Sequence, residues 1–310
     1  MERVAQEVAG PWRESRGEVV KPAQFEYDDP STVDEAMDLL GRYGDECKVL
    51  AGGQSLVPLM NFRLARPGRL IDINGIDSLA QMKWEDGALV IGAMTRHSQL
   101  EQSAEVAERC PLLSQAVAWI GHSQIRNRGT VGGSVAHADP AAELPAAFAA
   151  LDARFLVRSR RGDRTLTWRE FFVSEFTTAL QPDELLISIE VPAQRPSKGT
   201  ALVEFARRHG DFALGGAAVT VTVDRAGRCS EVAIALLAAG PAPIRPAAVE
   251  QMLIGEAPDK AAIHAAADMA VKGLKPTGDI HGSSDYRVQL LRVMTERALS
   301  EAVSRVGASQ

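Results

Sequence analysis

Hydrophobic and polar residues follow two periods along this chain, one typical of strands and the other typical of helices. Short apolar runs between polar turns predict buried strands at residues 25–27, 48–51, 69–73 and 88–93. A helix is predicted over residues 33–43, because Val33, Met37 and Leu40 are spaced to share one buried face. A second amphipathic helix is predicted over residues 110–120 on the same grounds.

The second half of the chain continues this mixture of elements. A hairpin is predicted from residues 155–158 and 164–167, which flank a polar turn. Residues 219–223 and 231–237 predict another pair of adjacent strands. Helices are expected last, at residues 246–252, 260–271 and 285–303.

A chain of 310 residues is long enough for two or three domains with their own cores. The first part, residues 1–20, is charged throughout and is expected to be a mobile N-terminal extension. The expected units after it are two α/β units and a C-terminal unit, at residues 21–75, 76–195 and 196–310.

Two Gly-Gly pairs suggest a ligand site. The first glycine segment is Ala51-Gly52-Gly53-Gln54-Ser55, and the second glycine segment is Thr130-Val131-Gly132-Gly133-Ser134. Because glycine has no Cβ, the N–H groups of such a pair can turn toward a common point. Two segments facing each other would hold the two phosphates of a dinucleotide. Neither has the GxGxxG or GxxxxGK[ST] spacing, so NAD-type and nucleoside triphosphate sites are not supported.

The residues after the second glycine segment predict a helix with an acidic start. Asp139 is expected to cap it, Pro140 to occupy its first position, and an alanine-rich run to continue it to Ala150. Glu143 has two interpretations. It stabilises the first turns of the helix, or it accepts hydrogen bonds from a ribose hydroxyl beside the phosphates. The residues alone leave both open.

Composition excludes several other classes of function. A net charge of −6 argues against a general nucleic-acid binder. The six histidines have no metal-ligand spacing, and no GxSxG nucleophile motif is present, so neither a metal site nor a hydrolase is indicated. Only three cysteines occur, whereas a [2Fe–2S] cluster usually takes four thiolates. Any iron–sulfur centre is therefore expected on a partner.

The segments AGGQSLVPLMNFRLARP and TVGGSVAHADPAAELPA resemble the flavoprotein subunits of the molybdenum hydroxylases. This family includes the medium subunits of carbon monoxide dehydrogenase-type enzymes and the FAD domain of xanthine dehydrogenase. Residues 178–192 and 205–213 fit the same family pattern, and the resemblance covers residues 21–305. It implies an α+β fold, with a two-subdomain PCMH-type FAD-binding domain. A C-terminal domain with a small antiparallel sheet and a helix bundle would follow.

The resemblance implies FAD as the cofactor, bound between the first two units. Ile120 and Leu186 would lie near the ring or the ribityl chain, Glu143 would meet the adenosine ribose, and Asp139 is a less certain contact. No side chain is expected to be catalytic or to bind a metal. The residues implied around the pyrophosphate are Leu50, Ala51, Gly52, Gly53, Gln54, Ser55, Leu56, Thr130, Gly132, Gly133 and Ser134.

One departure from the family concerns the start of the third unit, where some relatives use a lysine or tyrosine to touch the flavin. The corresponding stretch here is Leu202-Val203-Glu204, so contacts from this segment are in doubt. The family pattern also places an NAD site over the flavin in xanthine dehydrogenase, and nothing in this sequence identifies one. The external electron acceptor therefore stays open.

The resemblance implies an electron-transfer subunit that works in a complex. Its partners would be a small [2Fe–2S] subunit and a large molybdenum-cofactor subunit, in a dimer of heterotrimers. The alternatives are a self-contained FAD oxidase or reductase of the same fold, and a scaffold subunit that has lost FAD. Since no apolar run is long enough to span a membrane and the N-terminus is not a signal peptide, a cytoplasmic location is expected.

Overall fold

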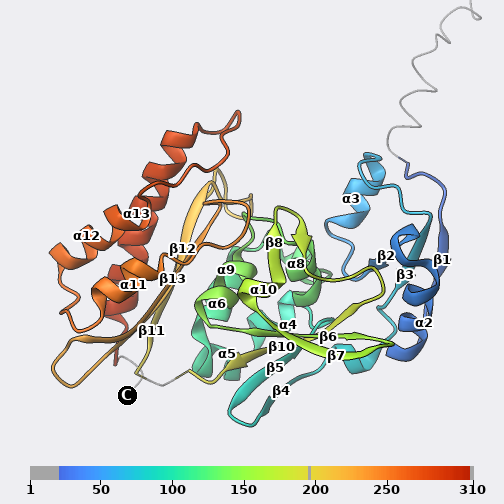
Figure 1. The fold of residues 1–310 in the computed structure, drawn as a ribbon, viewed down its shortest axis with the longest axis horizontal. Helices are drawn as coiled ribbons and strands as arrows, with labels where there is room; N and C mark the ends of the chain where they lie inside the picture. Colours follow the sequence, from blue (N-terminus) through green and yellow to red (C-terminus); the bar gives the residue numbers. More distant parts are fainter. Residues whose placement is uncertain (1–20, 195–196, 308–310) are drawn as a thin grey trace, which may run out of the picture.

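The computed structural model describes residues 21–194 and 197–307, so the expected N-terminal extension lies outside the described residues. Three sheets succeed one another along the chain, and a two-stranded ribbon within residues 172–178 precedes the last strand of the second sheet (Figure 1). Each of the three falls within one of the three units expected from the sequence, although the unit boundaries themselves stay a prediction. The mixed α+β fold is confirmed.

The first sheet is parallel and has the order β1-β3-β2. The helix α2 follows β1 and begins at the predicted residue, because the Thr32 side chain accepts a hydrogen bond from the Glu35 N–H. Ala36, Met37 and Leu40 form its buried face. The elements of this unit are β1 (Glu26–Asp28), α2 (Val33–Tyr43), η1 (Gly44–Glu46), β2 (Cys47–Leu50), α3 (Leu56–Asn61), β3 (Arg69–Asp72) and η2 (Asp77–Leu79).

The second sheet is antiparallel, with the order β4-β5-β10-β6-β7, and its predicted hairpin is the pair β6 and β7. Its strands are β4 (Met82–Glu85), β5 (Ala88–Gly92), β6 (Arg154–Ser159), β7 (Gly162–Thr167) and β10 (Leu185–Pro192). Its helices are α4 (His97–Gln102), α5 (Ala104–Arg109), α6 (Pro111–Trp119), α7 (Ser123–Arg126), α8 (Val131–His137), α9 (Glu143–Ala150) and α10 (Trp168–Phe171). The ribbon beside them consists of β8 (Phe172–Ser174) and β9 (Thr177–Thr178).

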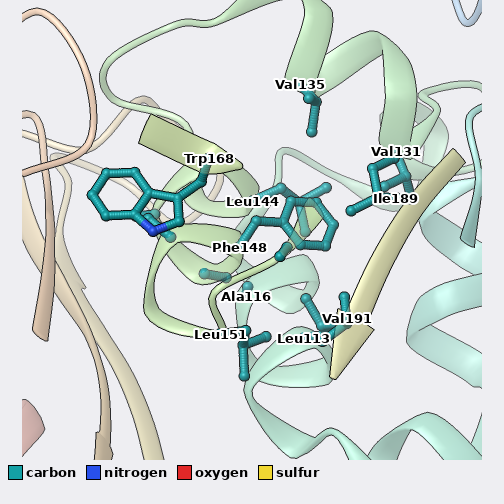
Figure 2. Packing of buried hydrophobic residues seen from close by; sticks show 14 of the residues in the cluster. Leu113, Ala116, Val131, Val135, Leu144, Phe148, Leu151, Trp168, Ile189 and Val191 are labelled. Carbon is teal, nitrogen blue, oxygen red and sulfur yellow. The ribbon is translucent and has the colours of Figure 1, made fainter. Parts of the chain in front are cut away.

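The helix α9 lies at the centre of the molecule. All of its residues are buried, as expected for a helix that is covered on every side. Figure 2 shows Leu144 and Phe148 of α9 among side chains of α6, α8 and β10. The same apolar cluster includes Leu202 and Leu237 of the third sheet, so one core joins the second unit to the C-terminal unit.

The C-terminal unit is an antiparallel sheet of order β11-β12-β13, with helices packed on the face that points away from α9. The predicted strand pair of residues 219–223 and 231–237 is confirmed as β12 and β13, and the three expected helices are present. The strand β11 was not predicted. The elements are β11 (Gly199–Phe205), β12 (Gly215–Val223), β13 (Cys229–Leu237), α11 (Ala247–Leu253), α12 (Lys260–Ala270) and α13 (Ser284–Ser304).

The predicted helix start at Asp139 is wrong. The Asp139 carboxylate accepts from the Ala141 N–H at 2.9 Å, and the Pro140 carbonyl accepts from the Ala238 N–H of the C-terminal unit at 2.8 Å. These bonds hold the chain in an irregular turn, so α9 begins at Glu143, three residues after the predicted first position, Pro140. The second glycine segment also differs from the expected loop, because Val131 already begins the helix α8.

The first testable prediction concerns this central core. We expect Phe148→Ala to lower the free energy of unfolding by about 3–5 kcal/mol, because it leaves a cavity among rigid neighbours. Phe62→Ala is the matched control, since Phe62 is 71% exposed and its loss should cost less than about 0.5 kcal/mol. Chemical denaturation of both variants measures the difference, and equal midpoints would contradict the packing described above.

Candidate functional site

A cavity of about 1030 Å³ lies where the three units meet. The first and second glycine segments both line it. The C-terminal unit contributes Arg207, Gly210 and Phe212, together with His281. Arg207 contacts the His281 ring, with 3.1 Å between Nη1 and Nδ1. A cavity of this size can enclose most of a ligand with many heavy atoms, such as a dinucleotide.

The first glycine segment turns sharply between β2 and α3. Gly53 has a φ of +73°, a conformation that L side chains rarely adopt, and the Gln54 side chain donates to the Gly52 carbonyl at 3.0 Å. The N–H groups of residues 52–56 donate to no acceptor among the described residues. A row of free backbone N–H groups beside a cavity is an arrangement that binds anions.

The second glycine segment has its N–H groups already engaged. The Thr130 hydroxyl accepts from the Gly133 N–H at 3.0 Å, and the Thr130 carbonyl accepts from the Ser134 N–H at 3.0 Å. The Gly132 N–H donates to the Ala93 carbonyl at 2.8 Å. The two segments are therefore not equivalent: the first presents free donors, and the second presents a close backbone surface and two hydroxyls.

The two glycine segments lie in direct contact with the same stretch of backbone. A Cβ on Gly52 would stand 2.4 Å from the Arg128 carbonyl oxygen, and one on Gly133 would stand 2.6 Å from Thr130 Oγ1. The Cβ of Ala51 is 3.7 Å from that same position on Gly133. Glycine at position 52 is therefore needed for the first segment to pack against the backbone before the second, whereas glycine at position 133 leaves room for the Thr130 hydroxyl of its own segment.

Arg96 and Asn74 connect the two glycine segments through a chain of hydrogen bonds. The Arg96 guanidinium donates to the Arg128 carbonyl just before the second glycine segment, and to Asn74 Oδ1 at 2.6 Å. Asn74 Nδ2 in turn donates to the Ala51 carbonyl at 2.8 Å. Burial lowers the pKa of Arg96, and the nearby Arg128 charge lowers it further. Sequence reasoning missed this bridge, since no motif marks either residue.

One wall of the cavity is the turn after α6, and this turn carries Ile120, which was expected near the ring or the ribityl chain. Arg126 donates to the carbonyls of Ile120 and Gly121, both at 3.1 Å, and pairs with Glu101 at 2.8 Å. The C-terminal unit closes on this turn, because a Cβ on Gly210 would stand 2.7 Å from the Gly121 carbonyl oxygen. Arg126 thus holds the turn that carries Ile120.

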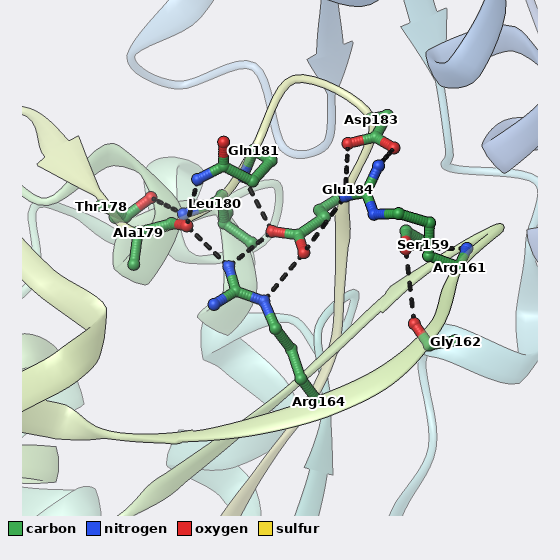
Figure 3. A network of polar contacts seen from close by, with 10 residues as sticks. All are labelled: Ser159, Arg161, Gly162, Arg164, Thr178, Ala179, Leu180, Gln181, Asp183 and Glu184. Carbon is green, nitrogen blue, oxygen red and sulfur yellow. Dashed lines mark hydrogen bonds and ion pairs between the residues drawn. The ribbon is translucent and has the colours of Figure 1, made fainter.

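The opposite wall carries Leu186, at the start of β10. A β-bulge between Leu186 and Ser188 breaks the register with β6, and bulges commonly redirect a side chain. Figure 3 shows the polar network that fixes the segment before the strand. Arg164 holds both oxygens of Glu184, at 2.8 and 2.6 Å, and also donates to the Ala179 carbonyl at 2.7 Å. Arg161 pairs with Asp183 beside it.

Glu143 is a buried acid in the lining of the cavity. It is 7% exposed at the first position of α9, and burial raises its pKa to about 7, with a further contribution from the Asp139 charge. Asp139 also lines the cavity. A carboxyl group in this setting is a strong acceptor for hydroxyl donors, since few other partners reach it.

Two histidines line the cavity as well. His97 is almost fully buried, and burial lowers its pKa to about 4, although the nearby Thr130 backbone acts in the opposite direction. The His137 ring lies 5.1 Å from the Phe176 ring, and burial lowers its pKa too. Both imidazoles are neutral near pH 7. Sequence reasoning had assigned no role to His97.

The structure brings almost all of the predicted site residues together around one cavity. Those that line it are Ala51, Gly52, Gly53, Gln54, Ser55, Leu56, Ile120, Thr130, Gly132, Gly133, Ser134, Asp139, Glu143 and Leu186. Leu50 does not line it and packs behind Gly53. Leu202, Val203 and Glu204 do not line it either. For each of the predicted site residues, contact with the ligand stays a prediction.

The cysteines are distributed over the three apolar clusters of the molecule. Cys47, Cys110 and Cys229 are buried and free, and each belongs to a different cluster. Among residues 21–194 and 197–307, no group of histidine, cysteine and acidic side chains gathers to hold a metal ion. Over the same residues, no helix combines the length and apolar character needed to cross a membrane.

A cavity shared by two α/β units and a C-terminal unit that packs against them defines a class of FAD-binding proteins. The family model of the FAD binding domain in molybdopterin dehydrogenase matches residues 23–194. The model of the CO dehydrogenase flavoprotein C-terminal domain matches residues 200–302. The chain belongs to this family of flavoprotein subunits, and FAD is its cofactor.

Individual relatives cover nearly the whole chain. The 6-hydroxypseudooxynicotine dehydrogenase complex subunit alpha of Paenarthrobacter nicotinovorans is 46% identical over 92% of this chain and 97% of its own length. The caffeine dehydrogenase subunit beta of a Pseudomonas strain is 39% identical over 93% and 97%. A solved carbon monoxide dehydrogenase structure from Hydrogenophaga pseudoflava matches with a TM-score of 0.90 and 40% identity, over 92% and 99% of the two chains. The chain is thus an oxidoreductase subunit of this family.

The second prediction tests the first glycine segment. We expect Gly53→Ala to weaken FAD binding by at least about tenfold, because the strained turn can no longer present its N–H groups to a charged ligand. Gly227→Ala is the control, since Gly227 has a similar φ of +76° and nothing within 4 Å of its missing Cβ. Fluorescence titration with FAD measures both. Wild-type affinity in Gly53→Ala would show that this segment is only a turn.

Proposed function

We propose that this chain is the FAD-carrying electron-transfer subunit of a molybdenum hydroxylase complex. It takes electrons from [2Fe–2S] clusters of a small partner subunit and passes them to an external acceptor. The substrate is hydroxylated on a large molybdenum-cofactor subunit, and the complex is a dimer of heterotrimers. The free N–H groups of residues 52–56, facing a cavity shared by three units, carry the proposal.

The residues around the cavity fit the cofactor. The first glycine segment offers donors for the pyrophosphate, and the second approaches closely enough to enclose it. The Glu143 carboxylate accepts hydrogen bonds from the hydroxyl groups of the adenosine ribose. Ile120 and Leu186 supply apolar surface for the flavin ring or its ribityl chain. Asp139 adds an acceptor at the same end. We propose these roles from the position of each residue on the cavity wall and from the chemistry of its side chain.

The cavity needs no acid–base machinery for this function. FAD, when bound, supplies the ring that accepts and donates electrons, and the protein sets its orientation and access. The chain's own residues exclude water and fix the walls, chiefly through Arg126 and the Arg164–Glu184 pair. The neutral His97 and His137 complete the lining without adding charge.

Partners for this subunit are supported by the names of its relatives, which are subunits of dehydrogenase complexes. The three cysteines lie in separate clusters, so an iron–sulfur centre would have to be supplied by another chain. Buried free thiols are typical of proteins in a reducing compartment, which supports a cytoplasmic location.

The third prediction concerns Glu143. We expect Glu143→Ala to weaken FAD binding by about 1–3 kcal/mol, because a hydrogen-bonded charged acceptor is lost. Glu105→Ala is the control, as Glu105 is also an acid in a helix first turn but lies on α5, outside the cavity. Calorimetric titration separates the two interpretations. Lowered stability with unchanged FAD affinity would leave Glu143 as a helix-stabilising residue only.

The fourth prediction is that the isolated chain oxidises no substrate of the complex. Co-purification should yield a small iron–sulfur chain and a large molybdenum chain, and only the assembled complex should reduce an artificial dye. The absorption spectrum of this chain alone should show oxidised flavin without an iron–sulfur shoulder. Substrate-dependent dye reduction by the isolated chain would favour a self-contained oxidase instead.

A further inference from the structure

A second buried acid, Glu204, lies behind the cavity on the C-terminal unit. It stands on β11 opposite Gly216 of β12. A Cβ on Gly216 would be 2.8 Å from the Glu204 Cβ and 2.7 Å from a methyl group of Leu237, so glycine leaves room for this side chain. Leu202, two residues earlier on β11, belongs to the apolar core shared with α9. Alternation along the strand therefore points Glu204 toward α9.

Glu204 has no counter-charge in this position. It is 6% exposed, both carboxyl oxygens are buried, and neither has a hydrogen-bond partner among the described residues. Burying an ionised carboxylate without partners is costly, so the neutral acid is favoured. Burial raises the pKa of Glu204 to about 9, and the negative charge of Glu143 contributes to this rise.

The groups around this pair of acids can be named element by element. The helix α9 contributes Glu143 as its titratable residue, and the turn before it contributes Asp139. Gly216 of β12 and Leu237 of β13 carry no charge. The neighbouring helix α8 contributes His137, which is neutral near pH 7 because burial lowers its pKa. The helix α13 packs on the other face of β11, and α6, which also packs against β11, carries no titratable side chain. The charges that act on the pair are those of Glu143 and Asp139, which are both negative.

We propose that Glu204 is a positioning residue for the cofactor: it keeps a proton so that Glu143 can face the cavity as the single carboxylate of the pair. This inference rests on the proposed role of Glu143 toward FAD. Two buried carboxyls that interact electrostatically do not both ionise readily, so one of them is favoured in its neutral form. Glu204 keeps the proton because it is remote from the cavity, whereas Glu143 lines the cavity.

Because of this pair of acids, the affinity for FAD should first rise and then fall as pH increases. Acceptance of hydroxyl hydrogen bonds favours the carboxylate form of Glu143, so affinity should rise as pH increases through about 7, the pKa of Glu143. Ionisation of Glu204 places a second negative charge beside Glu143, so affinity should fall as pH increases through about 9. Affinity is therefore greatest between these two values.

The fifth prediction is measured by titrating the full-length, FAD-free chain with FAD from about pH 6 to about pH 10. Glu204→Gln should keep wild-type affinity near pH 8 within about twofold and keep the rise near pH 7, but lose the fall above pH 9. Glu143→Gln should lose the rise near pH 7. Glu250→Gln is the control, because Glu250 of α11 is equally buried but pairs with Arg245, and its profile should match wild type.

An unchanged fall above pH 9 in Glu204→Gln would overturn the inference while leaving FAD binding intact. Failure of every protein to bind FAD would instead overturn the proposed function, and this inference with it. Infrared spectra of the wild-type chain without FAD give a second test that needs no variant. A protonated carboxyl band should be present near pH 8 and should disappear as pH rises through about 9. Absence of that band near pH 8 would also overturn the inference.

Discussion

The approach of Gly52 to the Arg128 carbonyl is the contact on which the rest of the site depends. No side chain larger than hydrogen fits there, because a Cβ would lie 2.4 Å from that oxygen. The contact joins the first unit to the second, and the Arg96–Asn74 bridge holds it in place. With the two glycine segments fixed against each other, the N–H groups of residues 52–56 point away from protein acceptors and remain available to a ligand.

Burial shifts the pKa values of several titratable side chains around the cavity. Burial lowers the pKa of His97 and of His137, which favours the neutral imidazole. Burial would raise the pKa of Glu184, but the hydrogen bonds from Arg164 hold it below its usual value. The acids Glu143 and Glu204 have no such cation, and burial raises the pKa of each. A pyrophosphate group carries its own negative charge. Glu204 lies behind the cavity and is favoured in its neutral form, so it adds no negative charge beside the ligand.

Local signals predicted the elements that depend on local interactions. The helix over residues 33–43 follows from its apolar spacing and the Thr32 cap, and the β6–β7 hairpin follows from its turn. The start of α9 was mispredicted, because a hydrogen bond from Ala238, about a hundred residues away, holds Pro140 out of the helix. The different hydrogen bonding of the two glycine segments could not be predicted either, because it depends on the hydrogen bond from the Gly132 N–H to the Ala93 carbonyl. The Arg96–Asn74 bridge likewise exists only after the units have packed.

The central claim is that the free N–H groups of the first glycine segment hold the phosphates of FAD. A high-resolution crystal structure of the FAD-loaded chain tests it most directly. The account predicts that pyrophosphate oxygens accept hydrogen bonds from N–H groups within residues 52–56, while the N–H groups of Gly132, Gly133 and Ser134 keep their bonds to Ala93 and Thr130. A pyrophosphate bound elsewhere, with residues 52–56 facing solvent, would contradict it.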